Sequence, residues 1–567
     1  MSRIGYAIFA SILANQPLTV VKGKRPVKIE TQDTISKIQT SDLLPTLPGL
    51  TLTQQGGPLA PSEVKWRGLS GARLAIDLNG ITLNDPVSGL FDVADIPFFA
   101  LQSITTRSGA LSFTLRSVEH NFLNTRFGYG SFSTAKYDLA AGAKINPNFN
   151  ILLAAQIGSS TGNFDYFPNS IRENNDQRRA NILANLSFKL TRLRGNTLFF
   201  SNWHEGGIPG LAGAQLPNLR GQHAYLNLSQ DFQLPLGLWK LDTQLQGRFD
   251  HRSTWELPNK NLSVVDFTQG KLNIEAIRFF SSKNKISGKL LGELGALHNF
   301  PYFRRGFGFE LSGSIPHLQT QAGIQNYSDV DTLWNAHINA SMTPTPWLLM
   351  GIRLSKSARP PTFIELYAPT GLIVGNGNLH PESMYEFELY TQAEKESLGS
   401  FKLAGFYGFL QNTILFVNRS AFEITPINTS GVHRGGFSAT LNLTPHKFIA
   451  IDWNTQFIAS KMLSTGAPLP TVPPWSSVLT LRVGEADKIC GWLKINYRDG
   501  VSSNLFGTLR TSAYWLTDLI IKIPLTSSIT LNASANNIFN MLTARDSNQI
   551  PLPGRAFFIS LESLSPL

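Results

Sequence analysis

The stretch FSATLNLTPHKFIAIDWNTQF, residues 437–457, decides the fold. From Phe437 to Leu443 apolar residues alternate with Ser, Thr and Asn, and from Ile449 to Phe457 apolar residues share one face while Asp, Asn and Gln share the other. Residues 444–447 contain a proline and predict a tight turn. Since side chains alternate between the two faces of a strand, the stretch predicts a β-hairpin with one apolar and one polar face.

Segments of this kind continue from about residue 118 to the C-terminus, separated by ten short breaks containing Pro, Asn, Gly or Ser. The breaks lie at residues 146–148, 192–196, 235–237, 281–284, 316–317, 343–346, 397–400, 444–447, 484–487 and 525–528. The usual spacing of about forty residues holds two strands of roughly ten residues and a longer loop. Ten turns on one side, with both termini on that side, predict a closed barrel of about 22 antiparallel strands.

The composition agrees with a barrel whose outer face lies in lipid. Only 15% of the 567 residues are charged, against about a quarter in a typical soluble domain. A soluble sandwich would bury its apolar faces against each other, but the regular turns favour an outer-membrane barrel with a polar lumen. No stretch approaches the roughly 18 apolar residues of a spanning helix. The single cysteine, Cys490, excludes a disulfide framework and multi-cysteine metal sites.

The first 117 residues lack this alternation and predict a different organisation. Residues 1–14 are typical of a secretory signal, and residues 15–30 form a linker segment. Residues 31–117 combine a helix-like run at 41–44 with short strands such as 74–78, which predicts a small α+β domain. Because this domain precedes a barrel covering 118–567, we expect it to lie inside the lumen as a plug.

Several motifs resemble those of TonB-dependent outer-membrane receptors. Residues 17–21, PLTVV, resemble the TonB box, an exposed segment that pairs with the periplasmic protein TonB through backbone hydrogen bonds. In the plug, WRG at 66–68 and the run from 74 to 85 follow the family's order and spacing. The resemblance assigns the TonB box to Leu18, Thr19, Val20 and Val21, and the plug motif to Arg67, Gly68, Asp77, Asn79, Gly80, Asp85, Arg107 and Gly109.

The sequence also departs from the family pattern. After Arg107 the family continues with a Tyr-Gly stretch and a Gly-Gly strand that complete the plug sheet, whereas here residues 111–115 lead almost directly into the barrel. The resemblance therefore implies a shortened plug. In the barrel, residues 359–367 and 377–382 resemble paired motifs that carry an outer loop. The last strand predicts Phe557, Ile559 and Leu561 facing lipid, although the chain ends in Ser-Pro-Leu rather than an aromatic residue.

The resemblance implies uptake of a scarce metal complex. Heme is disfavoured because the loop 368–376 and the plug before His120 contain no histidine. Cobalamin and a ferric siderophore remain equally open. Two polar segments would be apical plug loops, with amides suited to an amide-rich ligand. Their ligand-binding candidates are Gln54, Gln55, Asn84 and Ser88. No cofactor is required, but Glu173 and Asp176 offer oxygen ligands for calcium in an outer loop.

Other classes of function lack support in the sequence. No nucleophile elbow, complete phosphate loop or His-Glu-x-x-His motif is present, so we expect no enzyme. The net charge of +11 suits an anionic ligand or lipid headgroup, but no basic cluster interleaved with aromatics indicates nucleic acid. We expect a monomer in the outer membrane whose partners are TonB with its inner-membrane energy-transducing complex, a small metal chelate and the bilayer. The alternative is a passive, porin-like or structural barrel with a degenerate plug.

Overall fold

The computed structural model describes most of the chain. The described residues are 29–30, 39–47, 49–54, 56–107, 109–211, 213–258, 260–298, 300–368, 373–395, 398–420, 423–485 and 488–566. The predicted signal and the predicted TonB box, residues Leu18 to Val21, lie outside them. No helix in these ranges is long and apolar enough to cross a membrane.

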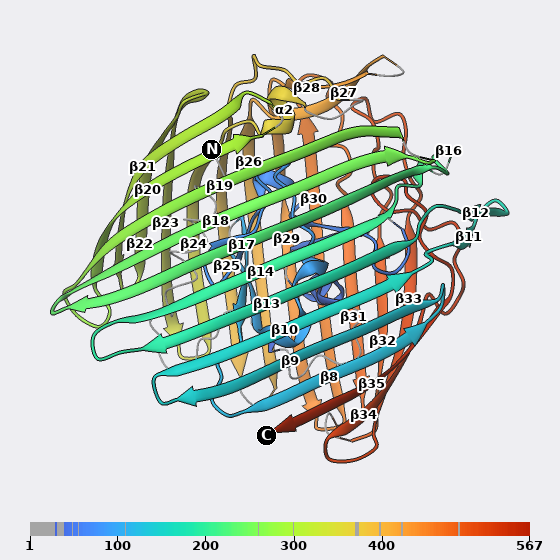
Figure 1. The fold of residues 1–567 in the computed structure, drawn as a ribbon, viewed down its shortest axis with the longest axis horizontal. Coiled ribbons are helices and arrows are strands. Elements are labelled where there is room, and N and C mark those ends of the chain that lie inside the picture. The colour runs from blue at the N-terminus through green and yellow to red at the C-terminus, as the bar shows by residue number, and fades with distance from the viewer. Residues whose placement is uncertain are drawn as a thin grey trace.

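Twenty-two antiparallel strands close into a barrel, as the turn spacing predicted (Figure 1). The strands are β8 (Phe122–Gly130), β9 (Thr134–Asn146), β10 (Phe149–Ser160), β13 (Gln177–Lys189), β14 (Arg194–Gly207), β17 (Leu219–Leu236), β18 (Trp239–Glu256), β19 (Lys260–Phe279), β20 (Lys285–Leu297), β21 (Tyr302–Ile315), β22 (Leu318–Tyr327), β23 (Val330–Thr345), β24 (Leu348–Arg359), β25 (Glu382–Lys395), β26 (Gly399–Gln411), β29 (Val432–His446), β30 (Ile449–Met462), β31 (Trp475–Val483), β32 (Cys490–Arg498), β33 (Tyr514–Pro524), β34 (Ile529–Asn536) and β35 (Ala556–Pro566). The last strand pairs with β8, with Ser563 opposite Thr125, and this pairing removes both sheet edges.

The ten predicted breaks all coincide with short connections between these strands, such as Pro147-Asn148 between β9 and β10. These connections define the turn side of the barrel, where β35 also ends. The opposite, loop side carries the longer connections. They contain the hairpins β11 (Phe164–Tyr166) with β12 (Ser170–Arg172), β15 (Gly210–Leu211) with β16 (Ala214–Gln215) and β27 (Ile414–Ser420) with β28 (Glu423–Asn428), and the helix α2 (Phe363–Tyr367).

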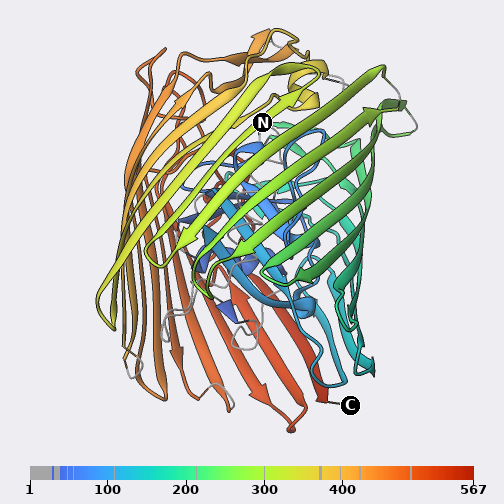
Figure 2. The ribbon, with the colours of Figure 1, turned by 90° about the vertical axis from the view of Figure 1, so that its left-hand side faces the viewer.

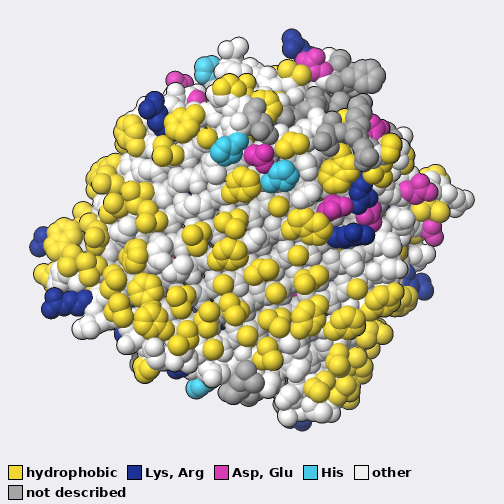
Figure 3. All heavy atoms as spheres, in the orientation of Figure 1, with side chains coloured by type: hydrophobic (Ala, Val, Ile, Leu, Met, Phe, Trp, Pro, Cys, Tyr) yellow, Lys and Arg dark blue, Asp and Glu magenta, His cyan; other side chains and the backbone are white. Residues whose placement is uncertain are grey.

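Alternation along each strand separates an apolar outer face from a polar lumen. In β35, Phe557, Ile559 and Leu561 are 47–57% exposed on the outside, whereas Phe558 and Ser560 point inward and are at most 5% exposed. The predicted facing of this strand is confirmed. Figure 3 shows the result on one side of the barrel, where apolar side chains cover the wall and charged side chains gather near its margins.

The N-terminal domain lies within the lumen, as the blue segments in Figure 2 show. Its main sheet has the order β1 (Ile29–Glu30), β6 (Leu101–Arg107), β7 (Ala110–Leu115), β4 (Ala75–Leu78) and β5 (Ile81–Thr82). A second hairpin pairs β2 (Leu50–Gln54) with β3 (Ser62–Trp66). The short 3-10 helices are η2 (Thr40–Thr46), η3 (Gly71–Arg73), η4 (Val93–Asp95) and η5 (Phe98–Ala100).

A strand completes the plug sheet although the plug sequence is short. Residues 111–115 belong to β7, which pairs antiparallel with β6 and parallel with β4, and the barrel strand β8 begins soon after at Phe122. A tight turn containing Gly109, at φ +72°, folds β7 back on β6. Leu111 and Phe113 are completely buried, so this strand supplies core to the plug without a Gly-Gly sequence.

Candidate functional site

Most of the plug-motif residues stabilise the plug itself. Asn79 and Gly80 both have positive φ, +50° and +83°, which a two-residue type I′ turn between β4 and β5 requires. The Asp77 carboxylate accepts hydrogen bonds from Gly80 N at 2.9 Å and Ser112 Oγ at 2.6 Å. Arg107 ends β6, and its side chain lies outside the described part of the structure.

The predicted ligand residue Asn84 is committed to the plug interior. Its Oδ1 accepts from Ile76 N at 2.8 Å, and its Nδ2 donates to the carbonyl oxygens of Leu74 at 2.9 Å and Gly89 at 2.8 Å. The residue is 3% exposed. Because these bonds use the amide to hold three backbone groups of the plug, the described geometry does not favour Asn84 as a ligand contact.

The neighbouring loop, residues 85–89, reaches the loop side of the barrel. Asp85 accepts hydrogen bonds from Val87 N at 3.0 Å and Ser88 N at 2.6 Å, and it pairs with Arg252 of β18 at 2.9 Å. Ser88 is half-buried, and its hydroxyl donates to Asp85. The loop is therefore held in one shape by a buried carboxylate and is fastened to the barrel wall.

A buried ion cluster fixes Arg67 of the plug motif to the wall. Its Nη1 lies 2.5 Å from Glu388 Oε2 and 3.6 Å from Glu386 Oε1, both on the lumenal face of β25. Arg434 of β29 pairs with Glu386 and donates to the backbone oxygen of Arg67 at 2.8 Å. Arg353 lies 2.5 Å from Glu388. Three arginines thus share two glutamates, and only one of the five residues belongs to the plug.

Aromatic rings enclose the same guanidinium. The Arg67 Cζ atom lies 4.4 Å from the ring centre of Trp66 and 4.5 Å from that of Phe406. Stacking of this kind adds to the attraction of the carboxylates. At the next residue, Gly68 has φ +78°, and a Cβ there would lie 2.7 Å from Val472 Cγ1 in an outer loop. The plug motif at Arg67 and Gly68 is therefore tightly packed against the barrel wall and an outer loop.

A second arginine cluster holds the opposite part of the plug. Arg179 of β13 donates to Asp92 at 2.7 Å, to Asp95 at 2.8 Å and to the backbone oxygen of Leu59 at 2.9 Å. Burial and the neighbouring Asp92 carboxylate raise the pKa of Asp95, while Arg179 acts in the opposite direction. The plug is therefore anchored to at least two separate sectors of the barrel wall.

Two outer loops grip the β2–β3 hairpin. Lys65 Nζ donates to Thr471 O at 3.2 Å, Thr471 Oγ1 at 3.0 Å and Ser547 Oγ at 3.1 Å, and Ser547 Oγ lies 2.8 Å from Thr53 Oγ1. Burial lowers the pKa of Lys65. Burial also raises the pKa of the adjacent loop residue Asp546 to about 6. Hydrogen bonds from Ile550 N and Asn548 N lower this pKa, but their effect is smaller than that of burial. Loop residues far along the chain thus complete the contacts of this hairpin.

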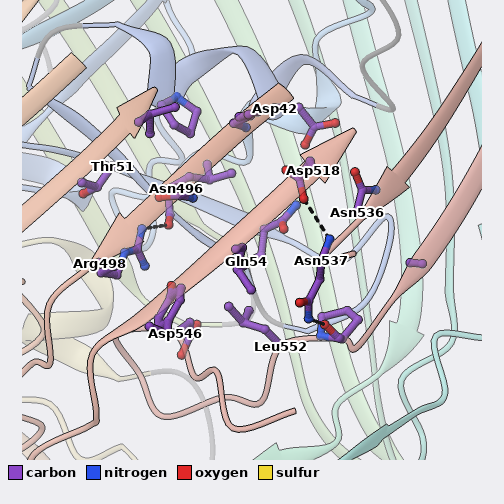
Figure 4. Close-up of a pocket in the computed structure, with 18 of the residues that line it drawn as sticks. Asp42, Thr51, Gln54, Asn496, Arg498, Asp518, Asn536, Asn537, Asp546 and Leu552 are labelled. Atoms are coloured by element: carbon purple, nitrogen blue, oxygen red, sulfur yellow. Dashed lines mark hydrogen bonds between the residues drawn. The ribbon is translucent and has the colours of Figure 1, made fainter. Parts of the chain in front are cut away.

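A cavity of about 240 Å³ lies between the plug and the wall formed by β30 to β35 (Figure 4). Its lining includes Asp42 and Gln54 of the plug and Arg498, Asp518 and Asp546 of the barrel. Gln54, a predicted ligand residue, therefore faces this cavity, whereas Gln55 lies outside the described residues. A volume of this size is below the usual range of about 300–1,000 Å³ for small-molecule sites.

A partly exposed aromatic group stands on the loop side beside residues 85–89. Val87 packs in one cluster with Phe363 of α2 and Phe267 of β19. Against this cluster, Tyr302 and Tyr367 stack with ring centres 3.8 Å apart and planes 8° apart. The sequence offered Tyr367 within the 359–367 motif, but its pairing with Tyr302 of a distant strand carried no signal along the chain.

One of the two predicted calcium residues is engaged by a neighbouring arginine. Both carboxylate oxygens of Asp176 accept hydrogen bonds from Arg220, at 3.0 and 2.8 Å, whereas Glu173 is exposed. The described residues contain no group of three or more His, Cys, Asp or Glu side chains placed to hold a metal ion. The geometry therefore gives no support to the calcium prediction.

The closed barrel, its apolar outer face and the tethered domain in its lumen define an outer-membrane transport protein with a plugged pore. Comparison with known proteins makes the family definite. The barrel model described as "TonB dependent receptor-like, beta-barrel" matches residues 111–538, and the "TonB-dependent Receptor Plug Domain" matches residues 20–117. The chain belongs to the TonB-dependent receptor family, whose members are outer-membrane receptors and transporters rather than enzymes.

Solved structures of the same architecture are similar along nearly the whole chain. The siderophore receptor PirA from Acinetobacter baumannii is 14% identical with a TM-score of 0.77, and the match covers 95% of this chain and 98% of PirA. A mutant of the ferric enterobactin receptor PfeA from Pseudomonas aeruginosa, in complex with enterobactin, is 13% identical with a TM-score of 0.78, over 95% and 99% of the two chains. The copper transporter OprC is 14% identical with a TM-score of 0.78, over 96% and 100%. At these identities the likeness establishes the fold.

Proposed function

We propose that this protein imports a ferric siderophore across the outer membrane by TonB-dependent transport. The observation that carries the choice of ligand is the stacked pair Tyr302 and Tyr367, partly exposed beside the apical loop 85–89. Aromatic side chains favour a ligand that presents flat rings, such as a catecholate chelate of iron. The net charge of +11 would steer an anionic chelate of this kind toward the protein.

Cobalamin is the weaker candidate. Its case rested on side-chain amides at the apical surface, and the Asn84 amide is used within the plug. Gln54 lines a cavity of about 240 Å³, which is small for a corrin. The likeness to PirA and PfeA, described as siderophore and ferric enterobactin receptors, supports the siderophore at the level of fold.

Binding to the purified full-length chain tests the ligand. We expect ferric enterobactin to quench tyrosine and tryptophan fluorescence with saturation, and cyanocobalamin to give no saturable change. Tyr367→Ala and Tyr302→Ala should each weaken ferric enterobactin binding at least tenfold. Tyr137→Ala is the matched control, because Tyr137 is 40% exposed on the outer face of β9, away from the lumen. Equal affinities of all three variants, or preferential binding of cyanocobalamin, would refute the ligand assignment.

Deletion of residues 17–21 tests the transport mechanism separately. The proposed TonB contact predicts that the deleted chain binds ligand normally but no longer supports uptake into cells. The passive-barrel alternative predicts unchanged uptake, with the 240 Å³ cavity beside β30 to β35 as the starting point of a leak. Uptake that survives the deletion would therefore favour the passive barrel even if the siderophore binds.

A further inference from the structure

The outer wall of the barrel carries a groove that faces the membrane. It has a volume of about 410 Å³ and is formed by side chains of β23 to β26, the yellow and light-orange strands at the left of Figure 2. Its walls are apolar and include Trp334, Ile338, Leu354, Phe387 and Tyr407. Lys356 also lines it, and His337 and Glu386 border it from positions that alternate with the outward-facing residues of their strands.

The register of the strands places Lys356 in a row of outward-facing residues that crosses five strands. Lys356 is paired with Tyr385, Tyr385 with Phe409, Phe409 with His433, and His433 with Lys461. No residue of this row is acidic. The row therefore combines three basic side chains with two aromatic ones at a single height on the barrel wall.

This height is the upper limit of the apolar band. Toward the turn side of Lys356, the outward residues of β24 are Leu354, Ile352 and Met350, which are 43–46% exposed. On β25, Phe387 and Leu389 continue the apolar surface below Tyr385, at 39% and 49% exposure. Aromatic and basic side chains at the end of an apolar band mark the level of the lipid headgroups.

The Lys356 side chain is held at the rim of the groove with hydrogen-bonding capacity to spare. Its Nζ atom lies 3.9 Å from the ring centre of Trp334 and donates to Trp334 O at 2.8 Å. An ammonium carries three N–H donors, and this carbonyl is the acceptor that the described structure supplies. The side chain is 8% exposed although it points toward the membrane. Its charge is therefore directed at the mouth of an apolar groove.

We propose that the groove binds an acyl chain of an outer-leaflet lipid whose headgroup phosphate pairs with Lys356. Lys461, on the same row, adds positive charge for further phosphate groups. The occupant follows from charge complementarity and position: the cations lie at headgroup height, and the apolar groove extends below them. A zwitterionic lipid would bring its own cation against the same basic row, so the site favours a lipid with net negative charge. This site is independent of the ligand that the protein transports.

Native mass spectrometry of the purified full-length chain in detergent tests the proposal. The probes are bisphosphorylated lipid A, the same lipid A without its phosphates, and dioleoylphosphatidylcholine. We expect retention of bisphosphorylated lipid A at least tenfold above the other two lipids. Lys356→Met keeps the length and apolar character of the side chain but should abolish this preference. Ala336→Phe, which adds a ring to the groove lining beside Lys356, should reduce binding to a similar extent.

Arg178→Met is the matched control. Arg178 is an exposed, outward-facing residue at the loop side of β13, away from the groove, and its loss should leave the preference intact. Heat-modifiable migration on gels checks that each variant is folded. Loss of binding in Ala336→Phe alone would show acyl packing without phosphate recognition, and loss in Lys356→Met alone would show a surface charge without a groove. Either result, or equal binding of the three lipids, would overturn the proposal.

Discussion

Neutralising Glu388 should loosen the plug more than removing the plug's own arginine. The cluster at this site contains Arg67, Arg353 and Arg434 against Glu386 and Glu388. Glu388→Gln would leave three buried or half-buried arginines facing one glutamate. Arg67→Met would leave two arginines with two glutamates, which remain paired. The charge balance therefore predicts that Glu388→Gln destabilises the plug more than Arg67→Met does. If only the plug's own residues mattered, the order of the two effects would be reversed.

The size of the effect follows from burial. Glu388 is 2% exposed and Arg67 is 5% exposed, so little water can replace a lost partner. Removing one member of a buried ion pair typically costs about 3–5 kcal/mol, and we expect Glu388→Gln to fall in this range. Arg67→Met retains balanced charge and some packing against Trp66 and Phe406, so we expect about half that cost. With a urea dependence of about 1.5 kcal/mol/M, 3 kcal/mol corresponds to a lowering of the unfolding midpoint by about 2 M.

Ion conductance through the full-length protein in planar bilayers gives the readout. Conductance should rise at the urea concentration where the plug unfolds, because the lumen then opens while the barrel remains closed on itself. Glu310→Gln is the control, since Glu310 is a buried lumenal carboxylate of β21 whose electrostatic neighbours lie in the barrel wall. A larger shift for Arg67→Met than for Glu388→Gln, or shifts no greater than that of Glu310→Gln, would refute the charge-balance argument.

Three further predictions use the same conductance midpoint. Because burial raises the pKa of Asp546 to about 6, its protonation stabilises the folded state fully below about pH 4, and this contribution is lost as the pH rises through 6. When the pH is raised from 5 to 7.5, the urea midpoint of the wild type should therefore decrease by more than the midpoint of Asp546→Asn. Equal decreases would contradict this prediction. Asn84→Ala should lower the midpoint by several times more than Ser88→Ala, since it leaves three buried backbone groups unpaired at about 1–3 kcal/mol each; similar shifts would place both residues outside the plug framework. Gly68→Ala should lower the midpoint through its contact with Val472, and Val472→Ala in that background should restore part of it; no restoration would exclude the clash as the cause.

The barrel could be predicted from the sequence because the alternation of residues within each strand indicates which side chains face outward. In β35, alternating Phe557 and Phe558 differ tenfold in exposure, 55% against 5%, although they are the same residue type. The position of each residue in the alternation along the strand, and not its residue type, decides which ring faces lipid. The ten turns are equally local, since Pro, Gly and Asn restrict the backbone within a few residues. Strand count and facing therefore follow from short-range rules.

The plug was harder to predict because part of its sheet pairs strands that are distant in the sequence. The strand β7 completes the plug sheet without a Gly-Gly sequence, and its partners are β6, two residues earlier, and β4, which lies about thirty residues upstream. The parallel pairing with β4 leaves no periodic signal, because β7 is buried on both faces except at Thr114. The plug sheet thus depends on contacts that only the folded domain reveals.

The same distinction separates the motif residues from the ligand contacts that we propose. A motif in one chain segment marks positions with strict local geometry. The Asn84 amide, for example, bonds three backbone groups with one acceptor and two donors, which no other side chain of that size and shape supplies. Ligand contacts need the opposite property, namely polar or aromatic groups left available by the fold. Tyr302 and Tyr367 have this property only because a strand and an outer-loop helix, 65 positions apart, meet above the plug. Ligand specificity in this protein is therefore to be sought in the meeting points of distant wall segments, where the sequence imposes no local pattern.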